Sequence, residues 1–254
     1  MKNTAYVVFD DAMLDFYESS LPILKEQNVP VTVFVATEPV TKGNTIWNYQ
    51  LFDFFLNTLF TEFELEIDNN IYRFKKDRNY YQDVMVFHQK MLHKSPDEIS
   101  KLFDFISKQL EVEEINNFAP VCSWSHLTQI SNLEIDLQAH THSHSYLPKQ
   151  SAEVMNKEFS LSKKEIKTKI GIETAMIAYP NGGYNNQVIE LARKYFSYGF
   201  SVDEKFVNLN RLNDPIYRMI IPRFNVHDQC AEEILLRTFG FHKMLRNIKS
   251  SIGL

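Results

Sequence analysis

The 254-residue chain has little cysteine and no long apolar segment, and each shortage excludes a class of protein. Cys122 and Cys230 are too few for a disulfide framework. No apolar run approaches the roughly 18 residues that a membrane-spanning helix needs. The first expected strand begins about five residues into the chain, which leaves no room for a signal peptide. Together these features predict a cytoplasmic protein.

Strong positive charge is also missing, because the formal net charge is −5. This value argues against a general nucleic-acid-binding protein. A length of 254 residues and a hydrophobic content of 44% allow one sizeable core. We therefore expect residues 1–254 to form a single catalytic domain with one elaboration.

Histidine, in contrast, is concentrated at one place. Three of the eight histidines, His140, His142 and His144, fall within five residues. Neutral imidazole is the commonest metal ligand, and a catalytic zinc usually takes three protein ligands beside an open position. On a continuing strand, His140 and His144 would lie roughly 13 Å apart, too far for one ion. The chain must therefore curl, and a helical turn would join these two histidines while pointing His142 away.

A carboxylate ligand would have to come from elsewhere, and the best source is near the N-terminus. Asp10 and Asp11 close an apolar segment at residues 5–9. Taken alone, the pair also fits a strand end with solvated acids, or an aspartate that caps the next helix. Buried acids cost free energy unless they have partners, so a shared site with the histidines is the interpretation that accounts for both features.

The order of expected elements indicates an α/β fold. Residues 5–9 and 29–37 are typical of buried strands, and residues 16–27 between them follow a helical pattern that Pro22 interrupts. This β-α-β start predicts a parallel sheet with right-handed crossovers. Later strands are expected at residues 133–140, 174–179, 198–202 and 218–226, and a helix at residues 151–170.

Residues 41–120 are expected to be an insertion into this pattern. They contain a helix at residues 46–60, a hairpin at residues 63–74 and a capping box that begins at Ser95. A segment that leaves after the second strand is expected to lie over the mouth of the sheet and to shape a substrate cleft. Its aromatic side chains fit a core better than a sugar-binding platform; they include Trp47, Tyr49, Tyr72, Tyr80 and Tyr81.

Residues 9–11 (Phe-Asp-Asp) and 140–144 (His-Thr-His-Ser-His) resemble the first two motifs of the polysaccharide deacetylase family. Members of that family are carbohydrate esterases that remove N-acetyl and sometimes O-acetyl groups from glycans. The resemblance implies that Asp10 is the general base and that Asp11, His140 and His144 bind one divalent metal ion, with zinc first among the choices. It also implies a distorted (β/α) barrel of about seven strands, with residues 41–120 as an inserted, mostly helical subdomain.

Residues 179–182 (Tyr-Pro-Asn-Gly) resemble the third motif of the family. The resemblance implies substrate or oxyanion contacts at Tyr179 and Asn181, with the Asn181 N–H as the oxyanion donor. Other members carry an arginine near the position of Ala178 that orients the base. Arg223 is the expected substitute, although it also fits a solvated residue at a strand end. His227, at the end of the last expected strand, is the candidate general acid.

These residues predict a metal-dependent deacetylase that acts on N-acetyl groups of a surface glycan or a glycan precursor. One rival is a carbohydrate O-acetyl esterase on the same metal ligands. A second rival is a catalytically silent glycan-binding barrel, but such a module would not need the base Asp10. The sugar, its carrier, the identity of the metal and the oligomeric state stay open.

The C-terminal residues 237–254 combine basic and apolar side chains. Four positive charges lie at Arg237, Lys243, Arg246 and Lys249. One interpretation is a final helix that covers the barrel with a solvated basic face. The other is a weak, salt-sensitive association with the anionic inner face of the membrane, which would bring the site to a lipid-linked glycan.

Overall fold

The computed structural model describes residues 5–112, 118–133 and 135–226. His227 and residues 237–254, on which the predictions of a general acid and of membrane contact rest, lie outside the described residues. No helix among the described segments is long and apolar enough to span a membrane.

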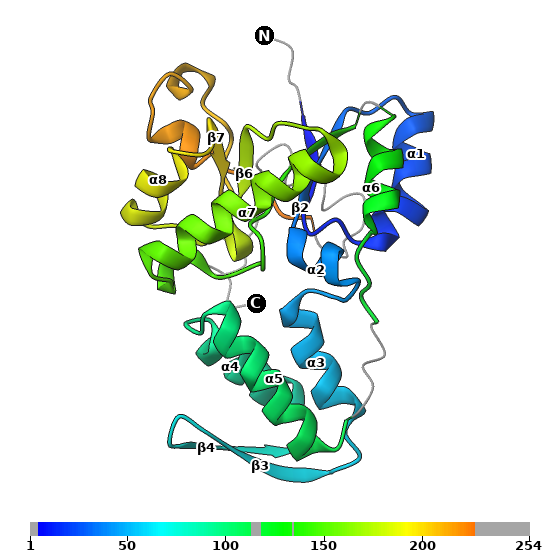
Figure 1. The fold of residues 1–254 in the computed structure, drawn as a ribbon, viewed down its shortest axis with the longest axis vertical. Coiled ribbons are helices and arrows are strands. Elements are labelled where there is room, and N and C mark those ends of the chain that lie inside the picture. The colour runs from blue at the N-terminus through cyan, green and yellow to red at the C-terminus, as the bar shows by residue number, and fades with distance from the viewer. Residues whose placement is uncertain (1–4, 113–117, 134, 227–254) are drawn as a thin grey trace, which may run out of the picture.

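A curled parallel sheet forms the centre of the molecule (Figure 1). Its five strands have the spatial order β1-β2-β5-β6-β7. They are β1 (Val7–Phe9), β2 (Val31–Val35), β5 (Asp136–Ala139), β6 (Met176–Ala178) and β7 (Tyr198–Phe200). Because every neighbouring pair is parallel, the carboxyl ends of all five strands meet at the same edge. The predicted α/β barrel class is confirmed, with five strands in the described sheet instead of about seven.

The strand predicted at residues 218–226 is wrong. A 3₁₀ turn occupies Tyr217–Met219, and after it only Ile221 pairs with the sheet, by a single bridge to Phe200. Pro222 follows directly and has no N–H to continue the ladder. The next hydrogen bond comes from a side chain and not from the backbone: Arg223 Nε donates to the Ser201 carbonyl at 3.1 Å.

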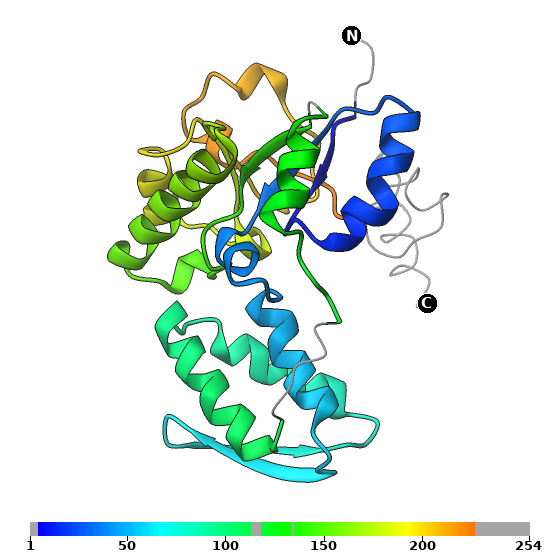
Figure 2. The same ribbon diagram turned by 45° about the vertical axis from the view of Figure 1, so that its right-hand side comes forward.

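Helices cover the sheet and connect its strands. A π-helical segment (Phe16–Ser20) continues directly into α1 (Leu21–Glu26), which has Pro22 in its first turn. The interruption that the sequence predicted at Pro22 is therefore a change from π-helix to α-helix. The other helices around the sheet are α2 (Thr37–Lys42), α6 (Trp124–Ser131), α7 (Ala152–Ile170) and α8 (Asn186–Ala192). Helices α1 and α6 lie side by side in both views, and α7 crosses the molecule in front of the sheet in Figure 1 (Figures 1 and 2).

The chain leaves the sheet after β2 and returns at β5, its neighbour, after building a second body (Figure 1). This body contains α3 (Trp47–Asn57), β3 (Glu62–Ile67), β4 (Asn70–Lys75), α4 (Tyr80–Met91) and α5 (Pro96–Leu110). We call it the insertion. The predicted hairpin and the capping box at Ser95 are both present. Among the described residues, the buried core of the insertion shares no member with the core around the sheet.

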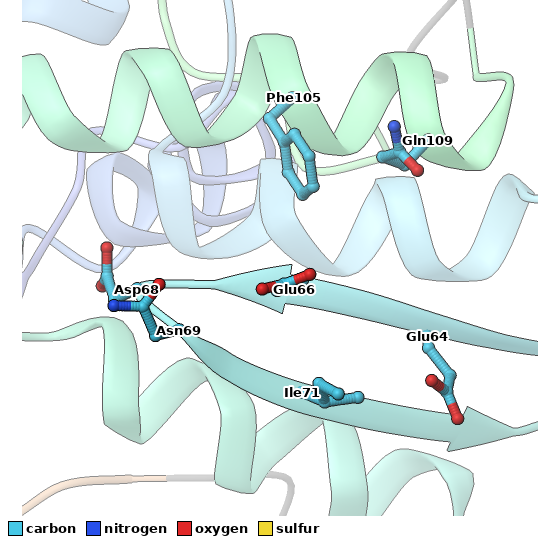
Figure 3. Close-up of a pocket in the computed structure, with 7 residues that line it drawn as sticks. All are labelled: Glu64, Glu66, Asp68, Asn69, Ile71, Phe105 and Gln109. Atoms are coloured by element: carbon cyan, nitrogen blue, oxygen red, sulfur yellow. The ribbon is translucent and has the colours of Figure 1, made fainter.

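A pocket of about 560 Å³ lies at the end of the insertion that is remote from the sheet (Figure 3). It is formed by the β3–β4 hairpin and α5, with Phe105 and Gln109 on the helical side. The remaining lining residues are Glu64, Glu66, Asp68, Asn69 and Ile71. None of the residues that the sequence singles out for catalysis or metal binding belongs to this lining, so the chemistry must be sought at the edge of the sheet.

Candidate active site

Asp11 converges with His140 and His144, which are distant from it in the sequence, beside the carboxyl ends of β1 and β5. The Asp11 Oδ1 atom lies 3.2 Å from His140 Nε2 and 3.3 Å from His144 Nε2. The three ligand atoms lie within 4.8 Å of one another. Asp11 has a left-handed φ of 72°, which turns the chain sharply after β1. The structure thus brings together the three residues that the sequence suggested as metal ligands.

The histidine segment curls as expected but by a different geometry. Residues 140–144 do not form a helical turn; instead Thr141 and His144 adopt left-handed φ angles of 63° and 61°. His142 leaves the cluster, and its Nδ1 lies 2.9 Å from Thr37 Oγ1 and 3.9 Å from Glu165 Oε2. The divergence of His142 from its two neighbours therefore comes from an irregular turn.

The geometry of the group fits a divalent metal ion. Asp11 Oδ1, which faces the Nε2 atoms of both histidines, is buried and has no hydrogen-bond partner within the described part of the chain. Two ligands at about 2.0–2.1 Å from a tetrahedral zinc would lie about 3.3 Å apart. The two distances from Asp11 to the histidine Nε2 atoms agree with this value. A carboxylate and two imidazoles are also a donor set that zinc accepts.

A carbonyl behind His140 fixes the orientation of its ring. The Nδ1 atom of His140 lies 2.7 Å from the Ala178 carbonyl oxygen, which can only accept a hydrogen bond. The proton of a neutral His140 ring is therefore on Nδ1, and the Nε2 lone pair faces Asp11. Such a partner behind a metal-binding histidine is typical of protein metal sites.

Burial and charge set the protonation of the three groups. Burial lowers the pKa of His144 to about 4, although Asp11 opposes this shift. Burial would raise the pKa of Asp11, but His144, His140 and Arg223 together bring it below its ordinary value. For His140, burial would lower the pKa, but the charges of Asp10 and Asp11 outweigh burial, so the pKa is raised.

Asp10 is held by an arginine from the far end of the described chain. Arg223 Nη1 and Nη2 donate to the two carboxylate oxygens of Asp10 at 2.7 and 3.0 Å. The guanidinium lies 5.6 Å from the ring centroid of Phe34 and 6.0 Å from that of Phe200. Arg223 is therefore not the solvated strand-end residue that the sequence left as an alternative. A bidentate pair of this kind fixes both the position and the plane of the carboxylate.

The third motif follows β6. The Tyr179 side chain is fully buried, and the backbone N–H of Tyr179 donates to the Phe200 carbonyl at 3.1 Å. The substrate contact expected at Tyr179 stays a prediction. Asn181 is exposed, with a left-handed φ of 53°. A Cβ on Gly183 would lie 2.3 Å from the Tyr146 ring. The glycine is therefore needed because the Tyr146 ring occupies the space beside it.

Two residues at the site escaped the sequence analysis. Glu158 on α7 is 2% exposed, and its carboxylate accepts hydrogen bonds from the backbone N–H groups of His142 and Ser143. Burial raises the pKa of Glu158, although its hydrogen bonds with Ser143 oppose the shift. A signal existed, because Glu158 lies three and four residues from the buried Met155 and Ser162 on α7. An acid at that spacing faces the core.

The second residue is Trp47, which joins the insertion to the histidine turn. Its Nε1 donates to the His144 carbonyl at 3.0 Å. Tyr49, two residues further along α3, has a pKa raised by burial and by the charges of Asp11 and Asp15. The sequence predicted both rings as core residues of the insertion, but the start of α3 lies beside the metal-ligand group.

The chain is similar in sequence to proteins of known class. Residues 1–197 match the family model described as polysaccharide deacetylase. Poly-beta-1,6-N-acetyl-D-glucosamine N-deacetylases of Staphylococcus aureus, among them those of strains N315 and MW2, are 25% identical to the chain over 243 residues. The match covers 95% of this chain and 61% of each relative. The chain thus spans about three fifths of the length of these relatives.

Solved structures are similar in fold. The Streptococcus pyogenes deacetylase PplD, in complex with acetate, superposes with a TM-score of 0.58 at 18% identity, covering 94% of this chain and 71% of that one. IcaB from Ammonifex degensii gives a TM-score of 0.52 at 15% identity, covering 92% of this chain and 72% of that one. At these identities the likeness shows a shared fold.

Proposed function

The chain belongs to the polysaccharide deacetylase family, and on that premise we propose that it is a metal-dependent enzyme that hydrolyses N-acetyl groups of a glycan. The observation that carries this proposal is that a group of metal ligands lies next to an oriented base. Asp11, His140 and His144 converge as a ligand group, and the Asp10 carboxylate beside them is oriented by Arg223. A ligand group next to an oriented base is what hydrolysis of an amide requires.

A divalent ion, which we propose to be zinc, would polarise the acetyl carbonyl and make water more acidic. Asp11, His140 and His144 would hold it. Asp10 then accepts the proton of the attacking water, and Arg223 keeps its carboxylate in the plane needed for that transfer. The exposed Asn181 backbone N–H is the candidate donor to the developing oxyanion.

The leaving group requires one more function. An amine leaves poorly unless it is protonated, so cleavage of an N-acetyl group needs a general acid more than cleavage of an ester does. His227 remains the predicted acid. Its replacement is therefore expected to reduce release of acetate from an N-acetyl substrate more than from an aryl acetate.

For the substrate we propose a polymer or precursor that carries N-acetylglucosamine. The support is the name of the Staphylococcus aureus relatives, whose printed activity is removal of acetyl groups from poly-beta-1,6-N-acetyl-D-glucosamine. The contact of Trp47 with the histidine turn supports a role for α3 at the border of the bound sugar.

Release of acetate tests the proposal. Purified protein supplied with zinc would be incubated with oligomers of β-1,6-linked N-acetylglucosamine, with other N-acetylated glycans and with an O-acetylated sugar. The proposal predicts acetate from an N-acetylated oligomer and almost none with the Asp10→Asn variant. Release from O-acetyl substrates alone would favour the esterase, and sugar binding without release would favour a silent glycan-binding barrel.

The location of the protein stays a prediction of its own. We propose that it works in the cytoplasm, with residues 237–254 resting weakly on the inner face of the membrane. Sedimentation with anionic and neutral vesicles at low salt tests the membrane contact. Recovery should be greater with anionic vesicles, and equal recovery with both kinds would contradict the contact.

A further inference from the structure

The turn that carries the two histidine ligands has an unusual backbone. Thr141 and His144 are both non-glycine residues with left-handed φ angles, a conformation that L residues rarely adopt. Such a conformation persists only where surrounding contacts hold it in place. The contacts of the turn should therefore show which residues keep His140 and His144 converged.

Backbone groups along the turn are bonded to elements on several sides. The His140 N–H donates to the Val35 carbonyl at 2.9 Å, and the His142 carbonyl accepts from the Glu38 N–H at 2.8 Å. The His144 carbonyl accepts from Trp47 Nε1 at 3.0 Å. These contacts come from β2, α2 and α3. The middle of the turn faces α7.

A single buried carboxylate on α7 makes the contacts to that middle part. Glu158 Oε2 accepts from the N–H groups of His142 and Ser143 at 2.9 and 2.8 Å. Its other oxygen, Oε1, accepts from Ser143 Oγ at 2.7 Å, and Ser143 Oγ lies 2.7 Å from Ser145 Oγ. Both carboxylate oxygens are thus used, and both act on His142 and Ser143, two of the three residues between the ligands.

We propose that Glu158 is a positioning residue for the metal centre: it holds residues 142 and 143 so that the imidazoles of His140 and His144 face Asp11. This inference rests on the metal site of the proposed function. Glu158 touches neither ligand side chain, so its effect passes through the backbone. A buried carboxylate that only stabilised α7 would have no reason to converge on two successive N–H groups of a ligand turn.

The chemistry of the contacts predicts how substitutions at this position behave. Alanine removes all three acceptor contacts and leaves two buried N–H groups without partners. Glutamine can keep the geometry, because its Oε1 can accept from both N–H groups while its Nε2 donates to Ser143 Oγ. The Ser143 hydroxyl would then donate to Ser145. Glu158→Gln should therefore rescue most of what Glu158→Ala loses.

Phe159, the next residue on α7, provides a matched control. It is fully buried and packs against Tyr195 and Phe196, but it makes none of the contacts to the turn described above. Phe159→Leu should lower the thermal midpoint by loss of packing. It therefore separates general destabilisation of α7 from loss of the hold on the turn.

The test measures zinc affinity by competition with a chromophoric chelator, at a temperature where every variant is folded. Glu158→Ala should bind zinc about 10–100-fold more weakly than wild type, as is typical when an outer partner of a metal site is lost. Glu158→Gln should lie close to wild type, and Phe159→Leu should match wild type despite its lower midpoint. Wild-type affinity in Glu158→Ala, or equal weakening in Phe159→Leu, would overturn the inference.

A second readout works without metal and separates this inference from the proposed function. Amide hydrogen exchange of the peptide that covers residues 140–146 should accelerate in Glu158→Ala but not in Phe159→Leu. If wild type bound no divalent ion, the proposed function would fail, and the exchange data alone would judge whether Glu158 holds the turn. Unchanged exchange in Glu158→Ala would refute the inference even in a protein that binds zinc well.

Discussion

The sheet and the insertion each bury histidine, but they surround it with different chemistry. His140 and His144 lie beside the carboxylates of Asp10 and Asp11, and His140 has a carbonyl partner behind its ring. His88 in the insertion is 6% exposed and lies against the rings of Trp47 and Phe52, at centroid distances of 5.1 and 6.1 Å. Neither of its ring nitrogens has a hydrogen-bond partner among the described residues.

The difference shows what makes a buried histidine functional. Burial without an acidic partner keeps the ring neutral, and the pKa of His88 is lowered by burial alone. At the sheet, burial is combined with opposite charges and with ligand atoms that face one another at metal-like distances. We infer that the sheet supplies the chemistry, whereas His88 is part of the packing of the insertion. Four predictions test this contrast.

The largest effects are expected for the two aspartates, which have separate roles. Asp10→Asn should keep bound zinc and lower acetate release by about 10²–10⁴-fold, because a general base contributes that much. Asp11→Asn should lower both zinc content and activity. Metal analysis of the two purified variants, with activity measured in parallel, distinguishes the roles. Equal loss of zinc from both variants would contradict the assignment.

The three histidines of the turn should also differ in their effect on metal binding. His140→Ala and His144→Ala remove ligands and should empty the site. His142→Ala removes contacts with Thr37 and Glu165, which are not metal ligands, so its zinc affinity should fall by less than the roughly tenfold that loss of an outer partner costs. A chelator competition assay measures all three. If His142→Ala alone lost its metal, the ligand set proposed here would be wrong.

Arg223 should affect activity and leave metal binding almost unchanged. Arg223→Met keeps an apolar stem against Phe34 and Phe200 but cannot hold the Asp10 carboxylate. We expect kcat to fall about 10–100-fold, as for other residues that orient a functional group. Arg223→Lys should recover only part of this loss, because an ammonium cannot form the bidentate pair. Wild-type kcat in Arg223→Met would show that Asp10 needs no such partner.

The smallest effect concerns His88 and appears in stability. Its pKa in the folded protein lies below the unfolded value of 6.5, so the unfolded state binds more protons on acidification. The stabilisation by neutral His88 is complete above pH 6.5 and is lost as the pH falls through the folded value. His88→Phe should therefore flatten the decrease in thermal midpoint between pH 7 and pH 5, relative to wild type.

The exposed His93 is the control for this measurement. The pH profile of the thermal midpoint should be flatter for His88→Phe than for His93→Gln measured in parallel. An unchanged profile in His88→Phe would mean that the ring is already protonated or solvated in the folded protein. The contrast between the histidines at the sheet and His88 in the insertion would then no longer hold.

The sequence predicted the ligand group because its chemistry is concentrated in two short segments. An Asp-Asp pair at a strand end and three histidines within five residues can be recognised without knowing the fold. The positions of β2, α3, α5 and α7 could also be predicted, because long periodic patterns and capping residues mark them. The conformation of the histidine turn could not, since left-handed angles at Thr141 and His144 are set by contacts from other elements.

The features that the sequence did not predict also depend on the folded chain. The pattern at residues 218–226 is that of a strand, but Pro222 stops the ladder after one bridge. The burial of the Tyr179 ring could not be predicted from the motif that contains it. Glu158 was overlooked among the other charged residues of α7, although its spacing from Met155 and Ser162 assigns it to the buried face; only the folded chain shows that this face meets the histidine turn.

The most direct test of the account is a zinc titration of the metal-stripped protein, with acetate release from an N-acetylglucosamine oligomer as the readout. The account predicts that activity is negligible at the start, rises in proportion to added zinc and stops rising at one equivalent per chain. The same titration should give no rise with Asp11→Asn. Undiminished acetate release by protein shown to be free of metal would contradict the central claim.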